Sequence, residues 1–136
     1  MIHGENLSYS YGRKVVLDGV SVTVPEYGTL GLVGPNGSGK TTLLRTLYGS
    51  LQPSGGAVSV DDRLLRRLSR RTLSKTLAVV AQEHPSDLPM IVADLVMLGR
   101  MPHQGLSSRP SAEDERIVED ALRQVGVLHL AGRNFS

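Results

Sequence analysis

The sequence predicts an α/β fold, on the basis of three consecutive segments. The run Thr29–Val33 is short and continuously apolar, which is typical of a strand buried on both faces. A glycine-rich loop, Gly34–Gly39, follows it directly. The next segment, Lys40–Tyr48, has the spacing of an amphipathic helix and is expected to end at Gly49. Its apolar face is expected to hold Leu43, Leu44 and Leu47.

The segment before this unit predicts antiparallel strands. Residues 7–24 alternate loosely between apolar and polar side chains, with a glycine-containing turn at residues 11–14. A period of two places Val20, Val22 and Val24 on one face. Residues 25–28 then predict a turn that leads into the apolar run.

Three segments follow the helix. Ala57–Val60 predicts another short strand, and Leu77–Ala81 predicts a buried strand that ends at Gln82. Between them, Arg63–Lys75 carries six basic residues and no acidic one. We interpret it as the solvated face of a helix, because no aromatic side chain accompanies the charges; an anion-binding site is the alternative.

The last third of the chain reads as helical. Val92–Leu98 predicts a short apolar helix closed by Gly99. Ser111 and Asp114 have the spacing of a capping box at the start of a longer helix, which Gly126 ends. The expected buried stripe of that helix is Ile117, Val118, Ala121, Leu122 and Val125, and Glu119 and Arg123 form an i,i+4 pair.

Composition excludes several classes of protein. The 136 residues are 40% hydrophobic and 21% charged, which is ordinary for a soluble globular domain. A net charge of +2 and few aromatic residues argue against nucleic acid as the main partner. The absence of cysteine excludes disulfides and thiolate metal sites. No run is long and apolar enough to predict a signal peptide or a membrane span.

Residues 34–41, Gly-Pro-Asn-Gly-Ser-Gly-Lys-Thr, match the pattern G-x-x-x-x-G-K-[ST]. Glycines let backbone N–H groups approach phosphate oxygens, and the helix N-terminus adds oriented donors. Lys40 supplies a positive charge, and the Thr41 hydroxyl can ligate Mg²⁺. The segment therefore predicts a nucleotide-phosphate site; the alternative is a glycine turn that only caps the helix.

Two residues outside the loop narrow the class of nucleotide-binding protein. Tyr11 lies in a turn where its ring can stack on a purine, whereas Tyr9 is expected to pack in the interior. Gln82 ends the predicted strand, where its amide can reach a metal ion or water. Together with the loop and Thr42, these residues closely resemble the nucleotide-binding subunits of ABC transporters.

The resemblance implies an α/β P-loop ATPase core of the ABC type with an antiparallel β subdomain, incomplete in this chain, and the start of a helical subdomain. Residues 1–91 correspond to the core and residues 92–136 to the helical subdomain. ATP and Mg²⁺ are the implied ligands, with Thr41 and Gln82 at the metal. The implied nucleotide-binding residues are Tyr11, Val16, Gly34, Pro35, Asn36, Gly37, Ser38, Gly39, Lys40, Thr41, Thr42 and Gln82.

The stretches 96–103 and 111–116 are similar to importers for iron siderophores, haem and cobalamin. This implies a subunit that hydrolyses ATP to drive uptake and pairs with a second ATPase subunit. It would dock on transmembrane permease subunits through the region from Gln82 to His103, and would therefore lie in the cytoplasm, peripheral on the inner face of the membrane. Two alternatives stay open: a truncated, non-catalytic nucleotide-binding or interaction module, and a soluble ABC ATPase not linked to transport.

Hydrolysis in that family needs further residues: an Asp and a Glu after an apolar strand, a distal His, and a signature loop containing Ser-Gly-Gly. The sequence has none of these in suitable contexts, so no catalytic residue is assigned, and we expect them to lie beyond Ser136. The chain thus resembles the N-terminal part of an ABC ATPase. Thr29–Val33 would then lack partner strands, and we expect the chain by itself to be marginally stable and inactive in hydrolysis.

Overall fold

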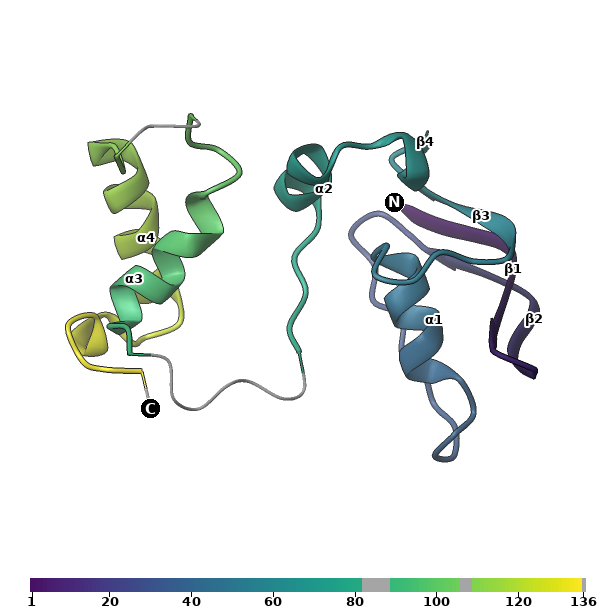
Figure 1. Ribbon diagram of the computed structural model, residues 1–136. Helices are drawn as coiled ribbons and strands as arrows, with labels where there is room; N and C mark the ends of the chain where they lie inside the picture. Colours follow the sequence, from purple (N-terminus) through teal and green to yellow (C-terminus); the bar gives the residue numbers. More distant parts are fainter. Residues whose placement is uncertain (82–88, 106–108, 136) are drawn as a thin grey trace. The chain divides into compact units, whose positions relative to one another are not determined.

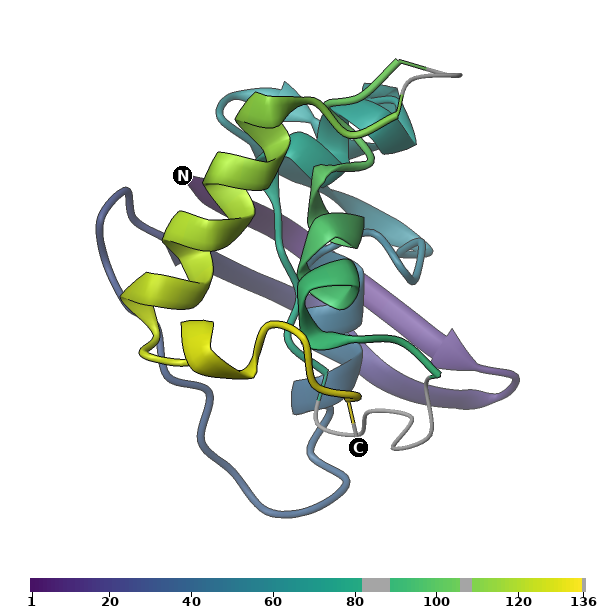
Figure 2. The ribbon, with the colours of Figure 1, turned by 90° about the vertical axis from the view of Figure 1, so that its left-hand side faces the viewer.

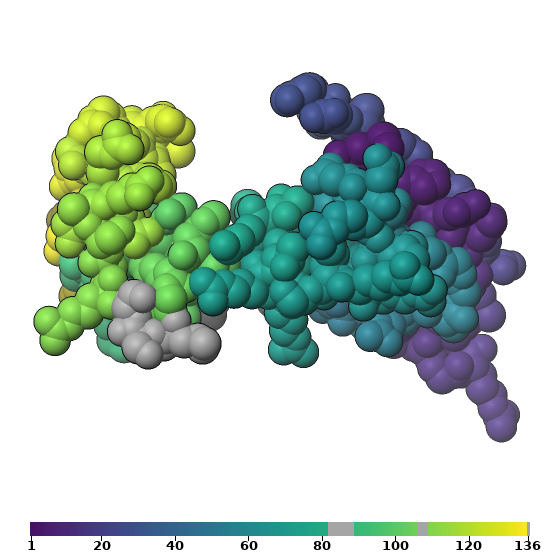
Figure 3. All heavy atoms as spheres, turned by 90° about the horizontal axis from the view of Figure 1, so that it is seen from above, coloured from purple at the N-terminus to yellow at the C-terminus, as the bar shows by residue number. Residues whose placement is uncertain are grey.

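The computed structural model describes residues 1–81, 89–105 and 109–135 (Figure 1). The chain divides into two compact units, Met1–Leu73 and Ser74–Ser136, and Figure 3 shows the surface of each in the same colours. The boundary predicted from the sequence, between a core of residues 1–91 and a helical subdomain of residues 92–136, stays a prediction.

The first unit contains one antiparallel sheet with the strand order β2-β1-β3-β4 (Figure 1). The hairpin predicted from the alternating residues is confirmed, with its turn at Gly12 and Arg13. In β2, Val20, Val22 and Val24 are half-buried while the residues between them are exposed, as their period of two predicts. The strands are β1 (Ile2–Tyr11), β2 (Lys14–Val24), β3 (Gly55–Val60) and β4 (Arg63–Leu64).

Helix α1 (Lys40–Leu47) packs against β1 and β2 and completes the core of this unit. The core cluster consists of Leu7, Leu17, Leu43, Leu47 and Val58. The predicted leucine stripe is wrong at Leu44, which is 50% exposed. The buried face runs through residues 42, 43, 46 and 47, so Leu44 points about 100° away from Leu43. Gly49 ends the helix with φ +81°, as predicted.

Two predicted strands are absent from the described residues. Neither Thr29–Val33 nor Leu77–Ala81 joins the sheet, and Val33 and Val80 are 98% and 90% exposed. A strand that is buried on both faces needs neighbouring strands on both sides, and no described strand pairs with either run. The expectation that Thr29–Val33 would lack partner strands is confirmed within the described part of the chain.

The basic segment Arg63–Lys75 does not form the single helix that its charge pattern suggested. It consists of β4, a 3-10 turn at Leu65–Arg67 and helix α2 (Arg70–Thr76). Ser69 starts α2, because its hydroxyl accepts from the Thr72 N–H at 3.1 Å. All six basic side chains are exposed, which confirms that they are solvated.

The second unit pairs helix α3 (Val92–Met97) with helix α4 (Ala112–Gln124), which lie side by side (Figure 2). A bridge between Ile91 and Asn134 ties the chain after α4 to the start of α3. Two 3-10 turns, Leu98–Arg100 and Leu128–Leu130, complete the unit. None of the helices in the described ranges is long and apolar enough to cross a membrane.

Helix α4 begins at the predicted capping box. Ser111 accepts from the Asp114 N–H at 3.2 Å, and the Asp114 carboxylate accepts from the Ser111 N–H at 3.1 Å. Val118 and Leu122 are buried as expected, but Val125 is 71% exposed, which corrects the last position of the predicted stripe. The helix ends at Gln124, and Gly126 has φ +76°, so Val125 belongs to the cap rather than to the apolar face.

The two unpaired apolar runs predict that this chain aggregates when heated. Exposed strand-sized segments offer their N–H and C=O groups to other copies of the chain. We expect light scattering to rise on heating, with little refolding on cooling. Single changes Val33→Lys and Val80→Lys should reduce the scattering, whereas Val125→Lys, at another exposed valine outside both runs, should not. A cooperative, reversible melt of the unsubstituted chain would contradict this.

Candidate functional site

The glycine-rich loop directs its backbone toward the start of α1. It turns at Asn36 and Gly37, where the Ser38 N–H donates to the Pro35 carbonyl at 3.3 Å. Gly37 and Gly39 have φ values of +82° and +92°, which L side chains rarely adopt. Two of the three glycines in residues 34–41, Gly37 and Gly39, therefore occupy positions at which the loop conformation favours glycine.

The N-terminus of α1 presents backbone donors. Leu43 is the first helical residue whose N–H has an acceptor within the helix or its cap, the Gly39 carbonyl at 2.8 Å. The N–H groups of Lys40, Thr41 and Thr42 precede it. Within this fully described helix, the first turn has no acidic side chain, and Gly39 offers no capping side chain. These donors and the positive end of the helix dipole favour an anion.

Lys40 spans the loop from the helix back to the beginning of the motif. Its Nζ donates to the carbonyls of Gly34 at 2.7 Å and Pro35 at 2.8 Å, and lies 3.5 Å from Ser38 Oγ. An ammonium has three donors, so it can exchange carbonyl oxygens for phosphate oxygens without leaving the loop. The structure thus places the positive charge beside the helical donors.

Gly39 connects the loop to the hairpin. The register passes from Tyr9↔Leu17 to Ser10↔Val15, which leaves Val16 as an unmatched residue in β2. A Cβ atom on Gly39 would lie 3.1 Å from the Val16 carbonyl oxygen and 3.2 Å from Val16 Cγ1. A side chain at position 39 would crowd Val16, so glycine favours this close approach and Val16 lies directly against the phosphate loop.

The hairpin carries the predicted base platform. Tyr11 ends β1 beside the turn and is 48% exposed, so part of its ring is accessible to a ligand. Tyr9 is half-buried and packs against the core cluster, which confirms its expected packing role. The two rings lie edge to face, with centroids 5.0 Å apart and an interplanar angle of 75°.

The two threonines after Lys40 differ in exposure. Thr41 is exposed, which leaves its hydroxyl available to a metal ion, whereas Thr42 is 7% exposed and has only its backbone N–H to offer. The second predicted metal ligand, Gln82, lies outside the described residues. Across residues 1–81, 89–105 and 109–135, no group of three or more His, Asp or Glu side chains is arranged to hold a metal ion. Thr41 thus fits as a single oxygen ligand.

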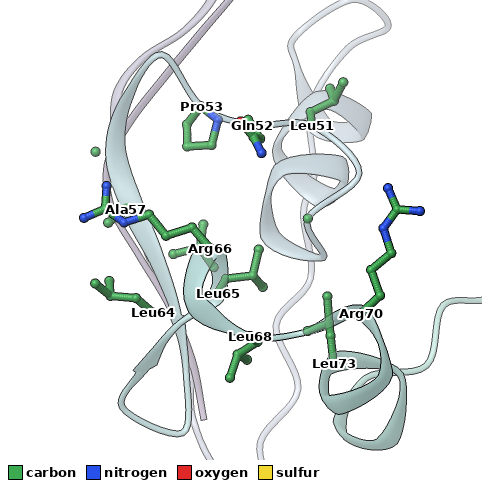
Figure 4. Close-up of a pocket in the computed structure, with 13 residues that line it drawn as sticks. Leu51, Gln52, Pro53, Ala57, Leu64, Leu65, Arg66, Leu68, Arg70 and Leu73 are labelled. Carbon is green, nitrogen blue, oxygen red and sulfur yellow. The ribbon is translucent and has the colours of Figure 1, made fainter. Parts of the chain in front are cut away.

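A separate cavity of about 370 Å³ lies between the segment that follows α1, β3 and the segment from Leu64 to Leu73 (Figure 4). Leucine is the most frequent residue of its lining, and Arg66 and Arg70 also contribute to its wall. No residue of the phosphate loop lines this cavity. Sequence reasoning did not anticipate it, because its walls come from segments that are brought together only by folding.

The described part of the predicted docking region, residues 89–103, contains α3 and the turn after it. Leu98 is 44% exposed and Met101 is 62% exposed. Arg100, in contrast, forms an ion pair with Asp114 of α4 at 2.8 Å, with its side chain only 20% exposed. This pair, which sequence reasoning missed, assigns Arg100 to holding the turn on α4.

Asp114 joins the capping box to that ion pair. Its carboxylate accepts from Arg100 Nε and from both the N–H and the hydroxyl of Ser111. The bond from Arg100, followed by those from Ser111, lowers the pKa of Asp114 from 3.8 to about 2. The ionised form is therefore favoured in the folded unit.

Comparisons with known proteins indicate the family to which the chain is similar. The family model described as "ABC transporter" matches residues 17–136. The chain is 34% identical over 133 residues to the ferric enterobactin transport ATP-binding protein FepC of Escherichia coli, covering 98% of this chain and 49% of that protein. It is 40% identical over 135 residues to the hemin import ATP-binding protein HmuV of Thermobifida fusca, covering 99% and 47%.

Among solved structures, a nucleotide-free ATP-binding cassette from an ABC transporter superposes with a TM-score of 0.76 at 25% identity. The match covers 98% of this chain and 56% of that one. The chain thus spans about half the length of the curated relatives it matches.

The Asp114 network predicts a pH-dependent contribution to the stability of α4. Because the folded pKa lies below the ordinary value, the stabilisation is fully present above about pH 4 and is lost as the pH falls through about 2. Asp114→Asn should therefore speed hydrogen exchange of α4 amides at neutral pH. The ratio of variant to unsubstituted exchange rates, compared at equal pH, should fall toward one near pH 2.

Asp120→Asn serves as the matched control, because Asp120 lies on the exposed side of the same helix, paired with Arg123. It should change α4 exchange only slightly at any pH. A ratio for Asp114→Asn that does not depend on pH would show that the lost carboxylate charge is not the cause.

Proposed function

This chain belongs to the ABC transporter family, and from that premise we propose that it binds ATP for an ATPase subunit that drives the uptake of an iron siderophore, haem or cobalamin. The named substrates of two relatives, ferric enterobactin and hemin, support the first two classes. Cobalamin, the third class, rests on the sequence resemblance alone. Because the chain spans about half of those relatives, hydrolysis and transport belong to the proposal.

One observation carries the ATP-binding part: the close packing of Gly39 on Val16. It joins two chemically different halves of a nucleotide site in one unit. On one side are Lys40 and the N–H donors of α1, which suit the charged triphosphate. On the other is the exposed ring of Tyr11, which suits the aromatic base.

Phosphate binding would replace contacts that Lys40 makes inside the loop. Its Nζ now lies between the Gly34 and Pro35 carbonyls, and phosphate oxygens would become additional or substitute acceptors. The N–H groups of Lys40, Thr41 and Thr42 would donate along the helix axis. The positive charge and the dipole act on the same anion, which is the electrostatic requirement of phosphoryl-transfer sites.

Mg²⁺ would be held in part by the Thr41 hydroxyl, and by Gln82 as the resemblance implies. When bound with ATP, Mg²⁺ neutralises phosphate charge. The part of the chain that the structure describes has no cluster of carboxylates or histidines at this site. No general base for the attacking water is assigned from the sequence, and we therefore propose that the chain by itself does not hydrolyse ATP.

The partners we propose are transmembrane permease subunits and a second ATPase subunit. Leu98 and Met101 offer an exposed apolar surface within the region expected to dock on the permease. Such docking would place the protein in the cytoplasm, on the inner face of the membrane. Arg100 is better assigned to the ion pair with Asp114 than to the permease contact.

Lys40→Ala tests the ATP-binding proposal. A lysine–phosphate contact is charge-assisted, so its loss should weaken ATP binding by about 10- to 100-fold. Binding of MgATP to the unsubstituted chain is expected to be weak, and saturation-transfer NMR at low protein concentration can measure it. Lys75→Ala removes an exposed lysine from α2 and should leave binding unchanged.

Phosphate release should be measured on the same samples. We expect no steady-state phosphate release from the unsubstituted chain, from Lys40→Ala or from Lys75→Ala. Phosphate release by the unsubstituted chain that disappears in Lys40→Ala would refute the proposal that the chain is inactive by itself. Equal ATP affinities of Lys40→Ala and Lys75→Ala would refute the assigned site.

A further inference from the structure

We propose that Tyr9 is a positioning residue that holds the ring of Tyr11 in one orientation and so sets the preference of the site for large aromatic bases. The inference rests on the proposed nucleotide function and adds a residue to it. Tyr9 itself would not touch the nucleotide. Its role follows from its packing against the core cluster and from its contact with the ring of Tyr11.

The contact between the two rings is specific in geometry. Tyr9 and Tyr11 stand two residues apart in β1, so their side chains leave the same face of the strand. Their centroids are 5.0 Å apart with an interplanar angle of 75°, which is the favoured edge-to-face arrangement of aromatic pairs. One ring therefore limits the rotation of the other.

The two rings differ in how firmly the protein holds them. Tyr9 packs against the core cluster and lies opposite Leu17, which is 3% exposed. Tyr11 is the last residue of β1 and is 48% exposed. The core thus fixes Tyr9, and the ring contact passes that restraint on to Tyr11.

The same core residue also restrains the phosphate loop. Leu17 Cδ2 would lie 3.4 Å from a Cβ atom on Gly39. Leu17 therefore stands between the strand position of Tyr9 and the start of α1. This arrangement sets the Tyr11 ring relative to the phosphate cradle, instead of leaving it free on a hairpin end.

A fixed ring has a consequence for selectivity. A half-exposed aromatic side chain that must be ordered on binding loses rotamer freedom, and prior ordering removes that cost. Only ligands with a base that stacks on Tyr11 gain affinity from this ordering, and the gain is larger for a purine than for a pyrimidine. Inorganic tripolyphosphate, which has no base, would gain nothing.

The test compares binding of ATP, CTP and inorganic tripolyphosphate to Tyr9→Leu and to the unsubstituted chain. Leucine fills part of the core but lacks the ring. We expect ATP affinity to fall about threefold to tenfold, the range that an aromatic pair is worth. CTP affinity should fall less, and tripolyphosphate affinity should not change.

Tyr9→Phe retains the ring and should bind all three ligands as the unsubstituted chain does. Tyr27→Leu removes a tyrosine that is fully exposed, and should likewise have no effect. An equal loss for all three ligands in Tyr9→Leu would show a purely structural role and overturn the inference. Absence of ATP and tripolyphosphate binding to the unsubstituted chain would instead refute the proposed function.

A second measurement needs no folded variant. The chain has four tyrosines, so fluorotyrosine labelling gives four assignable ¹⁹F signals. ATP should shift the signals of both Tyr9 and Tyr11, whereas tripolyphosphate should shift neither appreciably. ATP binding that leaves the Tyr11 signal unshifted would overturn the inference, because the base would then lie away from the ring that Tyr9 positions.

Discussion

The contact between Gly39 and Val16 is the constraint on which the candidate site depends. At φ +92°, with the Val16 carbonyl oxygen 3.1 Å from where a Cβ would stand, any side chain at this position would be strained and crowded, so the position favours glycine. The absence of a side chain lets the loop lie directly on the hairpin. Helix α1 then begins at the next residue, so its free N–H groups and Lys40 are located relative to β2. The close contact between Gly39 and Val16 thereby places the charged and aromatic halves of the site in one unit.

That contact works because the hairpin is irregular. A regular antiparallel register would pair every residue of β2, but Val16 is left unmatched, so its carbonyl and side chain are available to the loop. Its neighbour Leu17 remains in the core with Leu43 of α1. The core, the bulge and the loop therefore support one another. A substitution in any of them is expected to shift the position of the phosphate-binding donors at the start of α1.

Features that depend on neighbouring residues in the chain could be predicted from the sequence. The phosphate loop, the hairpin turn at Gly12 and the capping box of Ser111 with Asp114 all follow from spacing and local hydrogen bonding. Features that depend on distant partners could not. Thr29–Val33 has the composition of a buried strand but no described strand beside it, and Leu44 lies off the face that the sheet covers. The Arg100–Asp114 pair and the packing of Val16 on Gly39 likewise join residues 14 and 23 positions apart, for which the sequence carries no local signal.

The affinity of Gly39→Ala for ATP, compared with that of Gly19→Ala, tests this account most directly. Both glycines have positive φ, at +92° and +61°, but a Cβ on Gly19 would meet nothing within 4 Å. The comparison therefore sets a glycine packed on Val16 against a glycine of positive φ at which a Cβ would contact nothing. We predict that Gly39→Ala lowers ATP affinity at least about tenfold, because the added methyl group must push the loop off the hairpin, and that Gly19→Ala changes it by less than about twofold. Equal affinities for the two variants would contradict the claim that this packing holds the site together.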